Sequence, residues 1–357
     1  MSKVFNIAVV GYGMAAKVFH IPILKSVPAF HLYAIVQRHP TADDDAEKDH
    51  PGIKSHRSTE EMVKDPAVDV VVITTIPDTH VHLAKLALEA KKHVLVEKPI
   101  APTSLEAEEL IDLAKKQGCL ITVYQNRRWD SDYLTLSQLI KDNSLGRLVE
   151  FETHFDRYRP EVPSAESWKT RPLPASGALY DLGTHLIDQV IHSFGLPQRI
   201  TGFVGAQRRG ETQGFEDSFT VLLHYEDGLL ATAKSSVISP ETTQLRYWIR
   251  GEKGSFKKHH LDCQEDQLKQ GMKPGDVGFA LESQDRYGSL TTAVGGELRC
   301  RKYPTIQPAT YAGFYKTFAA ALAGESEVPV QAEQARDVIR LIELARKSSK
   351  EGRTLDV

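Results

Sequence analysis

Over the first third of the chain, short apolar segments alternate with amphipathic stretches. Apolar residues run almost continuously through five segments, as in strands that are covered on both faces. These segments are residues 4–10, 32–36, 68–75, 93–98 and 120–124. The spacing predicts helices at 80–91 and from Thr103 or Ser104 to about Gly118, where acidic residues in the first turns suit the helix dipole. The alternation predicts one doubly wound α/β domain with a parallel sheet over residues 1–126.

After Ser131 the pattern changes to period two. A helix at 133–141 precedes alternating segments at 149–155, 199–207, 218–225, 229–236 and 244–250. Further helices are expected at 177–194 and 331–347, and the Gly-rich, polar stretch 271–296 is expected to be a long loop. We therefore predict that residues 127–357 form an α+β domain with a large, mostly antiparallel open sheet, which binds substrate. Its open face needs a cover, so a homodimer or homotetramer is expected.

Composition narrows the class of protein. The chain has 357 residues, 41% hydrophobic and 25% charged, with 44 basic against 47 acidic residues and a net charge of −3. There is no basic excess to neutralise a phosphate backbone and no apolar run of roughly 18 residues, so we expect neither nucleic-acid nor membrane binding. Cys119, Cys263 and Cys300 lie too far apart for a disulfide framework. The N-terminus leads directly into a strand, and a cytoplasmic enzyme is expected.

A glycine-rich turn follows the first strand. Gly11-Tyr12-Gly13-Met14-Ala15-Ala16 fits G-x-G-x-x-G/A and opens a helix. Gly11 permits a tight turn, Gly13 lets the backbone approach a pyrophosphate, and the helix N-terminus supplies N–H donors. The position of this motif in the first βαβ unit predicts a Rossmann dinucleotide-binding domain.

The end of the second strand bears on the choice of cofactor. An acidic residue there would bind the adenosine ribose hydroxyls, but this chain has Gln37-Arg38-His39. A guanidinium at Arg38 can grip a 2′-phosphate, which favours NADP over NAD. The alternative is that Arg38 is a surface arginine and that one of the three aspartates at 43–45 folds back onto the ribose.

Two further motifs carry chemistry. Glu97-Lys98-Pro99 ends the fourth strand, and the carboxyl ends of parallel strands line the ligand crevice of such sheets. In the helix at 177–194, Asp181 and His185 are four residues apart and share one face, with Asp188 another possible neighbour of the imidazole. A carboxylate and an imidazole fixed on one helix suit acid–base chemistry.

Together these motifs resemble the Gfo/Idh/MocA family, which includes glucose–fructose oxidoreductase and inositol dehydrogenase. The matching stretches cover nearly the whole chain: residues 11–16, 73–77 with His80, 92–99 and 177–188. Residues 125–130, 155–160 and 251–256 look most like the NADP-dependent scyllo-inositol dehydrogenase branch. The chain departs from its relatives at Ser176, where a glycine is common, and at Lys169, where many have arginine.

The resemblance implies the roles of individual residues. It assigns Lys98, Asp181 and His185 as the catalytic group. The chemistry agrees, because a neutral imidazole can take the alcohol proton and an ammonium can stabilise the alkoxide, although which of Lys98 and His185 accepts the proton stays open. The expected cofactor-binding residues are Gly11, Tyr12, Gly13, Met14, Ala15, Gln37, Arg38, His39, Thr75, Ile76, Pro77, His80, Glu97, Lys98, Asn126 and Trp168. The expected substrate-binding residues are Lys98, Asn126, Tyr158, Arg159, Asp181 and His185.

The predicted function is an NADP-dependent oxidoreductase that moves hydride between nicotinamide and a secondary alcohol or ketone of a polyol, inositol or sugar. No metal is expected, because neither the histidines at 80 and 82 nor those at 259 and 260 have a carboxylate or thiolate at suitable spacing. Two alternatives remain open. One is a non-catalytic NAD(P)-sensing regulatory protein, and the other is an enzyme similar to dihydrodiol dehydrogenase or biliverdin reductase.

Overall fold

The structure is a computed structural model that describes residues 3–162, 173–208, 215–307 and 310–357. The chain forms two compact units. Unit one comprises Met1–Asn126, Gln264–Phe279 and Thr310–Arg336, and unit two comprises Arg127–Cys263, Ala280–Ala309 and Asp337–Val357. The first long segment ends where the cofactor domain is expected to end. Two later segments also belong to unit one, so the compact units are not contiguous in sequence, and the functional division into 1–126 and 127–357 stays a prediction.

Unit one contains a six-stranded sheet in the order β3-β2-β1-β4-β5-β6. Its strands are β1 (Phe5–Val10), β2 (Phe30–Val36), β3 (Lys54–His56), β4 (Val70–Ile73), β5 (His93–Val96) and β6 (Ile121–Val123). Every neighbouring pair is parallel. Parallel strands are covered on both faces, and β4 accordingly is buried at all four residues. This strand order is that of a dinucleotide-binding sheet, with its crevice at the carboxyl ends of β1 and β4.

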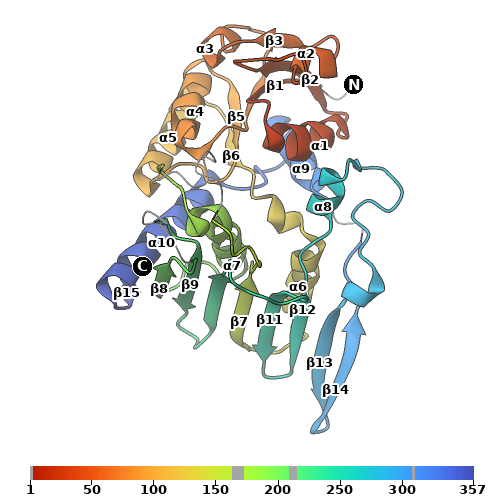
Figure 1. The fold of residues 1–357 in the computed structure, drawn as a ribbon, viewed down its shortest axis with the longest axis vertical. Helices are drawn as coiled ribbons and strands as arrows, with labels where there is room; N and C mark the ends of the chain where they lie inside the picture. The colour runs from red at the N-terminus through yellow and green to blue at the C-terminus, as the bar shows by residue number, and fades with distance from the viewer. Residues whose placement is uncertain (1–2, 163–172, 209–214, 308–309) are drawn as a thin grey trace. The chain divides into compact units, whose positions relative to one another are not determined.

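Helices lie on both sides of this sheet, with α4 and α5 on one side and α1 on the other (Figure 1). The α5 helix begins where the Thr103 hydroxyl accepts a hydrogen bond from the Glu106 N–H, as an N-cap does. The helices of unit one are α1 (Ile21–Lys25), α2 (Ala46–Asp49), α3 (Thr59–Met62), α4 (His80–Glu89), α5 (Ser104–Gln117), α8 (Gln264–Lys269) and α9 (Ala312–Leu322). Two short turns, η1 (Ala15–His20) and η2 (Pro77–Thr79), follow β1 and β4.

The described residues of unit two form a nine-stranded sheet in the order β14-β13-β12-β11-β7-β10-β9-β8-β15. The strands are β7 (Leu148–His154), β8 (Arg199–Gly205), β9 (Ser218–His224), β10 (Leu230–Ser235), β11 (Leu245–Gly251), β12 (Gly254–His259), β13 (Gly288–Val294), β14 (Glu297–Tyr303) and β15 (Leu355–Asp356). All neighbours are antiparallel except β7 and β10. The predicted fold class, a parallel doubly wound sheet followed by a mostly antiparallel open sheet, is confirmed.

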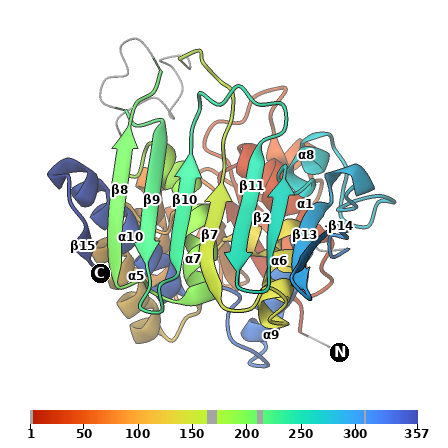
Figure 2. The same cartoon turned by 90° about the horizontal axis from the view of Figure 1, so that it is seen from below.

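One face of the second sheet is covered by α6 (Ser131–Lys141), α7 (Thr184–Phe194) and the unit-two part of α10 (Ala332–Glu351). Figure 2 shows the strands from the opposite side, in front of these helices. The core lies between sheet and helices, where Phe151, Ile249, Leu186 and Val190 are fully buried. The homodimer or homotetramer that would cover the outer face stays a prediction.

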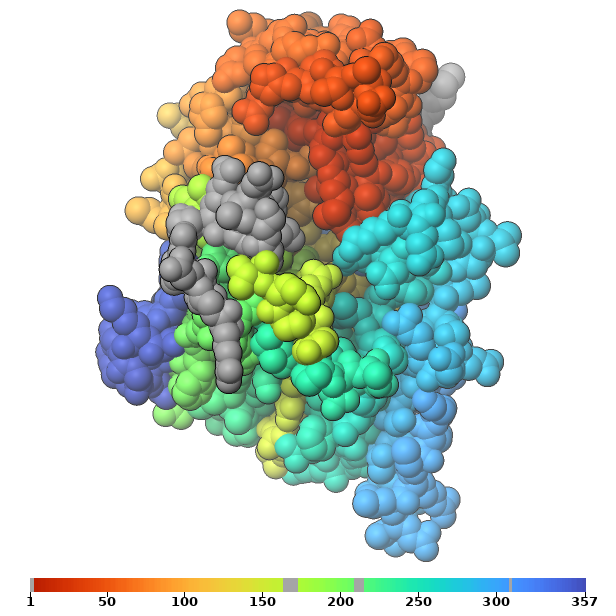
Figure 3. All heavy atoms as spheres, viewed as in Figure 1, coloured from red at the N-terminus to blue at the C-terminus, as the bar shows by residue number. Residues whose placement is uncertain are grey.

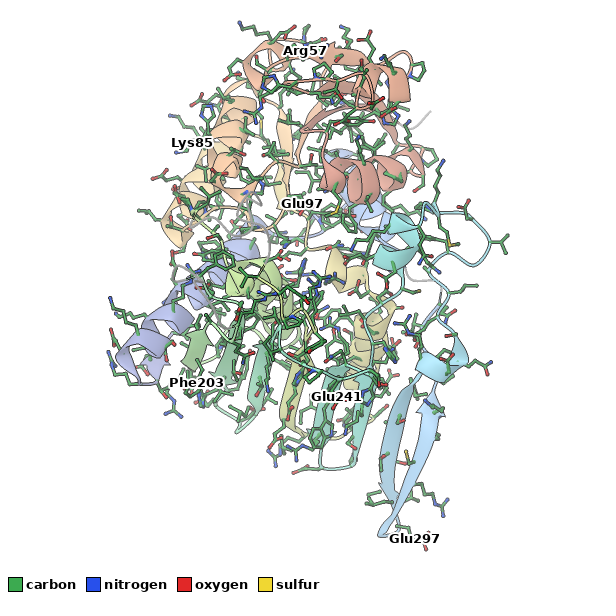
Figure 4. All side chains as sticks on the ribbon, in the orientation of Figure 1. Arg57, Lys85, Glu97, Phe203, Glu241 and Glu297 are labelled. Carbon is green, nitrogen blue, oxygen red and sulfur yellow. The ribbon has the colours of Figure 1, made fainter. Side chains whose placement is uncertain are left out.

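The prediction of a long loop at 271–296 is wrong for the second half of that stretch. The η6 turn (Gln284–Arg286) and strand β13 lie in this stretch, and β13 pairs with β14 from Gly288–Tyr303 to Val294–Glu297. Gly295 and Gly296, both with positive φ, make the two-residue turn at which antiparallel strands reverse. The hairpin projects from unit two in Figure 3, with Glu297 labelled at its end in Figure 4. Its strands carry many polar residues, and β14 is almost wholly exposed. The sequence therefore shows no clear alternation of apolar and polar residues that would predict these strands.

Among the described residues, no helix combines the length and the apolar character that a bilayer crossing needs.

Candidate functional site

The turn after β1 has the backbone shape that a dinucleotide-binding loop needs. Gly11 has a φ of +95°, and its N–H donates to the Val36 carbonyl at 3.0 Å. A Cβ at Gly11 would lie 3.1 Å from both the Thr74 Oγ1 and the Thr75 Cγ2, so a side chain there would crowd the end of β4. A Cβ at Gly13 would meet nothing within 4 Å, and the backbone there faces open space. The predicted turn therefore offers an accessible backbone at the start of a helix, where a pyrophosphate binds.

The side chains on this turn point in different directions. The Tyr12 hydroxyl donates to Asp49 Oδ2 at 2.7 Å, and the Lys17 ammonium lies 4.3 Å from the centre of the tyrosine ring. Burial, helped by the hydrogen bond to Asp49, raises the pKa of Tyr12 far above its ordinary value. Met14 is 59% exposed. Tyr12 thus braces the turn against α2, and binding of a cofactor by the backbone from Gly11 to Ala15 stays a prediction.

At the end of β2, Gln37 and Arg38 behave differently. Gln37 is buried, its Nε2 donates to the Asp44 carbonyl at 2.8 Å, and its Oε1 accepts from the Ala46 N–H at 2.8 Å. Its amide therefore shapes the loop at 41–46. The next two residues, Arg38 and His39, are exposed at the carboxyl end of the strand. Arg38 is thus placed where a group on the adenosine ribose would lie.

Two of the three aspartates in this loop have other partners. The Asp44 carboxylate accepts from the Lys17 ammonium at 2.6 Å. The Asp45 carboxylate caps α2 and accepts from the Glu47 N–H at 3.0 Å. Neither carboxylate is held for a ribose in this arrangement.

His80 connects the ends of β4 and β5. It is fully buried, with Nδ1 2.8 Å from the Pro99 carbonyl oxygen and Nε2 3.1 Å from the Thr75 carbonyl oxygen. Burial lowers the pKa of His80. The neutral ring donates to one of these main-chain oxygens and packs against the other, so the histidine lies between the two strand ends. Ile76 and Pro77 lie between, at the start of η2.

Lys98 follows β5, beside a carboxylate that the sequence assigned only to cofactor binding. Glu97 Oε1 lies 2.8 Å from His20 Nε2, and Glu97 Oε2 accepts from the Lys98 N–H at 3.0 Å. Burial works against the charge on Glu97, but the hydrogen bond with His20 and the positive charge of Lys98 hold its pKa below the usual value. Figure 4 labels Glu97. Sequence reasoning missed His20, whose one signal is a lone histidine at the end of the helical turn that follows the glycine motif.

In unit two, Asp181 and His185 lie on a helix that changes type between them. Asp181 is in a π-helical turn, η5 (Leu179–Gly183), and His185 is the second residue of α7. The Asp181 N–H donates to the Gly177 carbonyl at 2.9 Å, and His185 is 7% exposed. Residues four apart stay on the same side in π-helical and α-helical turns alike, and π-helical turns recur at functional sites. The helix predicted at 177–194 is therefore not a continuous α-helix. It begins with a π-helical turn that contains Asp181, one of the residues expected to be catalytic.

Buried polar groups anchor α7 beyond His185. Arg128 Nε and Nη2 donate to the two Asp188 oxygens at 2.8 and 2.6 Å, a bidentate pair that is almost fully buried. Gln189 Nε2 donates to the Arg127 carbonyl, and Gln189 Oε1 accepts from Arg246 and Tyr247, each at 2.8 Å. Asp188, expected as a possible neighbour of the imidazole, thus also has a structural role, because its carboxylate binds Arg128.

Asp130, next to this anchor, gives a prediction for pH dependence. Burial raises its pKa well above the usual value despite the opposing charge of Arg127, and the nearby carboxylates of Asp262 and Asp132 add to the rise. A raised pKa means that the native state holds a proton the unfolded chain releases above about pH 4, so stability falls as pH rises from there. Asp130→Asn lacks this penalty, although it also gives up the buried ion pair with Arg127. Its free energy of unfolding relative to that of the wild type should therefore increase as pH rises from about 4 to 7, measured by urea unfolding.

The control is Asp142→Asn, which changes an exposed aspartate after α6 and should give no difference that grows with pH. A constant offset between Asp130→Asn and the wild type over the whole range would contradict the assignment.

The remaining predicted residues lie in several places. Asn126 is the last residue of the long first segment of unit one and begins the turn η3 (Asn126–Trp129). In unit two, Tyr158 is 58% exposed and bridges to Ile238, while the exposed Arg159 donates its N–H to the Val237 carbonyl. Trp168 and Lys169 lie outside the described residues. Within the described ranges, no cluster of three or more histidine, cysteine, aspartate or glutamate side chains could hold a metal ion.

Comparison with known proteins matches both parts of the chain to one family. Residues 5–125 match the NAD-binding Rossmann fold of the Gfo/Idh/MocA oxidoreductases, and residues 137–357 match the C-terminal alpha/beta domain of the same family. Together the two matches span nearly the whole sequence and agree with the two sheets described above.

Individual relatives cover the chain from end to end. The scyllo-inositol 2-dehydrogenase (NADP(+)) IolW of Bacillus subtilis is 36% identical over 350 residues, 98% of this chain and 95% of IolW. An oxidoreductase of Schizosaccharomyces pombe, C115.03, is 38% identical over 363 residues, 98% of each chain. The solved structure of the oxidoreductase yvaA from Bacillus subtilis superposes with a TM-score of 0.94 at 35% identity, covering 100% of this chain and 99% of the other. The chain therefore belongs to the Gfo/Idh/MocA family of nicotinamide-dependent oxidoreductases.

Proposed function

We propose that the protein is an NADP-dependent dehydrogenase that acts on a secondary alcohol, or the matching ketone, of a polyol, inositol or sugar. The observation that carries the proposal is the arrangement at one edge of the parallel sheet. The glycine turn after β1 and Lys98 after β5 both stand at carboxyl strand ends, with β4 between those strands. Rossmann sheets bind their dinucleotide at this edge, so a cation there is placed to act on the substrate.

The residues fit a nicotinamide dinucleotide. The open backbone at Gly13 and the start of η1 would hold the pyrophosphate, and Arg38 would hold the adenosine end. When bound, the nicotinamide supplies the hydride chemistry. The exposed Arg38, with Asp44 and Asp45 bonded elsewhere, supports NADP over NAD. The name of the relative IolW, which specifies NADP(+), points the same way.

The protein's own residues would handle the proton and the charge. We propose that the His185 imidazole takes the proton from the substrate hydroxyl, since histidine is the side chain that most often acts as a general base. The Lys98 ammonium would stabilise the developing alkoxide, or polarise the ketone in the reverse direction. Asp181 would orient the imidazole or accept a substrate hydroxyl, and Asn126, Tyr158 and Arg159 would contact the remaining hydroxyls. These acceptors and donors suit a substrate rich in hydroxyl groups.

A substrate panel tests the proposal. Inositols, other polyols and aldoses are supplied with NADP+ or NAD+, and absorbance at 340 nm reports the reduced cofactor. We expect turnover of at least one cyclic polyol or sugar with NADP+, and slower turnover with NAD+. Cofactor binding without turnover of any substrate in either direction would instead favour the regulatory alternative.

Arg38→Ala tests the choice of cofactor. Removing a charged hydrogen-bonding group should raise the KM for NADP+ roughly 30-fold, while the KM for NAD+ changes less than about threefold. Initial rates with each cofactor at saturating substrate measure both values. The control is Arg340→Ala, an exposed arginine on α10. Equal losses for both cofactors would show that Arg38 does not bind the 2′-phosphate.

A further inference from the structure

A buried chain of four polar groups leads to Lys98 within unit one. Tyr315, from α9, has its hydroxyl 2.7 Å from His20 Nδ1, and His20 Nε2 lies 2.8 Å from Glu97 Oε1. Glu97 Oε2 in turn accepts from the Lys98 N–H at 3.0 Å. His20 and Tyr315 are fully buried, and the Glu97 side chain is only 13% exposed. The Tyr124 ring packs on the imidazole, with centroids 4.3 Å apart, and excludes water from it.

The donors and acceptors in this chain fix the hydrogen bond between His20 and Glu97. A carboxylate only accepts, so His20 Nε2 carries the hydrogen that is donated to Glu97. The Tyr315 hydroxyl forms the second hydrogen bond of this ring, at Nδ1. Burial raises the pKa of Tyr315 far above its ordinary value, which keeps that hydroxyl protonated and able to donate. Each of these groups therefore has a hydrogen-bond partner, and Glu97 carries a negative charge as the carboxylate among them.

This charge is costly where it lies, because a buried carboxylate loses the hydration it has in water. Apolar side chains of similar volume would fill the same space without that cost. The charge stands at the strand end that carries Lys98, on the sheet edge where the dinucleotide is proposed to bind. Its position suggests a role toward the cofactor and the lysine rather than in stability alone.

We propose that His20, held by Tyr315, is a positioning residue that keeps Glu97 as a fixed carboxylate, and that this carboxylate fixes the main chain of Lys98 and favours the oxidised over the reduced cofactor. The inference rests on the proposed function, because it takes the nicotinamide to bind at this sheet edge. The oxidised ring is cationic and the reduced ring is neutral, so a fixed negative charge nearby stabilises the oxidised form selectively. Without the imidazole, the carboxyl group would lose a hydrogen bond that lowers its pKa and holds its position, and its effect on the cofactor would weaken.

The test compares affinities for NADP+ and NADPH, measured by calorimetry and by cofactor fluorescence. In His20→Leu the ratio of the two dissociation constants, Kd(NADP+) over Kd(NADPH), should rise about tenfold above the wild-type ratio, the scale of one lost charged hydrogen bond. His20→Gln, whose amide nitrogen can take the place of Nε2, should restore most of the wild-type ratio. Tyr315→Phe should have a smaller effect, since the bond to Glu97 remains. His31→Gln, at an exposed histidine on β2, is the matched control.

A double variant separates this role from general packing. Glu97→Gln should shift the ratio as His20→Leu does, and adding His20→Leu to Glu97→Gln should shift it no further. A ratio within twofold of wild type in both His20→Leu and His20→Gln would overturn the inference. Two independent, additive shifts would overturn it too, because His20 would then not act through Glu97.

A second measurement needs no cofactor. Hydrogen exchange of the Lys98 amide in the cofactor-free protein should be faster in His20→Leu and close to wild type in His20→Gln, since Glu97 Oε2 is the acceptor of that amide. Unchanged exchange in His20→Leu would contradict the positioning role. If the wild type turns over no polyol or sugar but these shifts occur, the substrate proposal fails and the role of His20 stands.

Discussion

Lys98→Met is expected to lower kcat about 100- to 1,000-fold while NADP+ still binds with nearly unchanged affinity. The substitution keeps the length of the side chain and removes the ammonium that would stabilise the alkoxide, a contribution made mainly in the transition state.

His185→Ala should lower kcat by about 10²- to 10⁴-fold, because it removes the proposed proton acceptor. Rates at 340 nm give the loss of turnover, and fluorescence titration with NADPH gives cofactor affinity.

Each variant has a matched control. Lys85→Met changes a surface lysine of unit one that pairs with Glu109, and His82→Ala changes a histidine whose side chain is 69% exposed. Both should retain wild-type kcat. Full activity in Lys98→Met or in His185→Ala would refute the role assigned to that residue.

Asp188→Asn is expected to lower the free energy of unfolding by roughly 3–5 kcal/mol, because it leaves the Arg128 guanidinium buried without a charged partner. The loss is large since both side chains are almost fully buried and joined by two hydrogen bonds. Urea unfolding followed by circular dichroism measures it. Activity should fall as well, because this pair anchors the helix that carries His185.

The double variant Arg128→Met with Asp188→Leu distinguishes lost pairing from lost packing. Two apolar side chains of similar volume should recover most of the stability that the single variant loses. The control is Glu252→Gln, in an exposed pair with Arg147, which should cost less than about 1 kcal/mol. A loss from Asp188→Asn as small as this would show that the buried pair contributes little.

The sequence predicted the parallel sheet well because its signal is local. The cores of β1, β4 and β5 are unbroken apolar runs, and a buried strand needs that pattern. The hairpin of β13 and β14 carries no such signal, since β14 is exposed along nearly its whole length. The two strands pair because Gly295 and Gly296 form the turn between them and because β13 also pairs with β12. The alternation of apolar and polar residues shows neither feature.

The position of a candidate residue was predictable where a strand end fixes it, and its contacts were not predictable where residues distant in sequence provide them. Arg38 and Lys98 follow directly from the ends of β2 and β5. His20 contacts Glu97, 77 residues away, and Tyr315, 295 residues away, so the sequence around His20 does not reveal its partners. Gln37 also stands at a strand end, but the loop that follows bonds its amide, and no local pattern shows this.

The outer edge of β14 bears on how the protein avoids aggregation. A terminal strand presents main-chain N–H and C=O groups that another chain can pair with, and charged side chains along it discourage such pairing. Arg299, Arg301 and Lys302 supply these charges beside the highly exposed Leu298. Replacing them with threonine or valine would remove the mutual repulsion between copies and leave a strand suited to fibril growth.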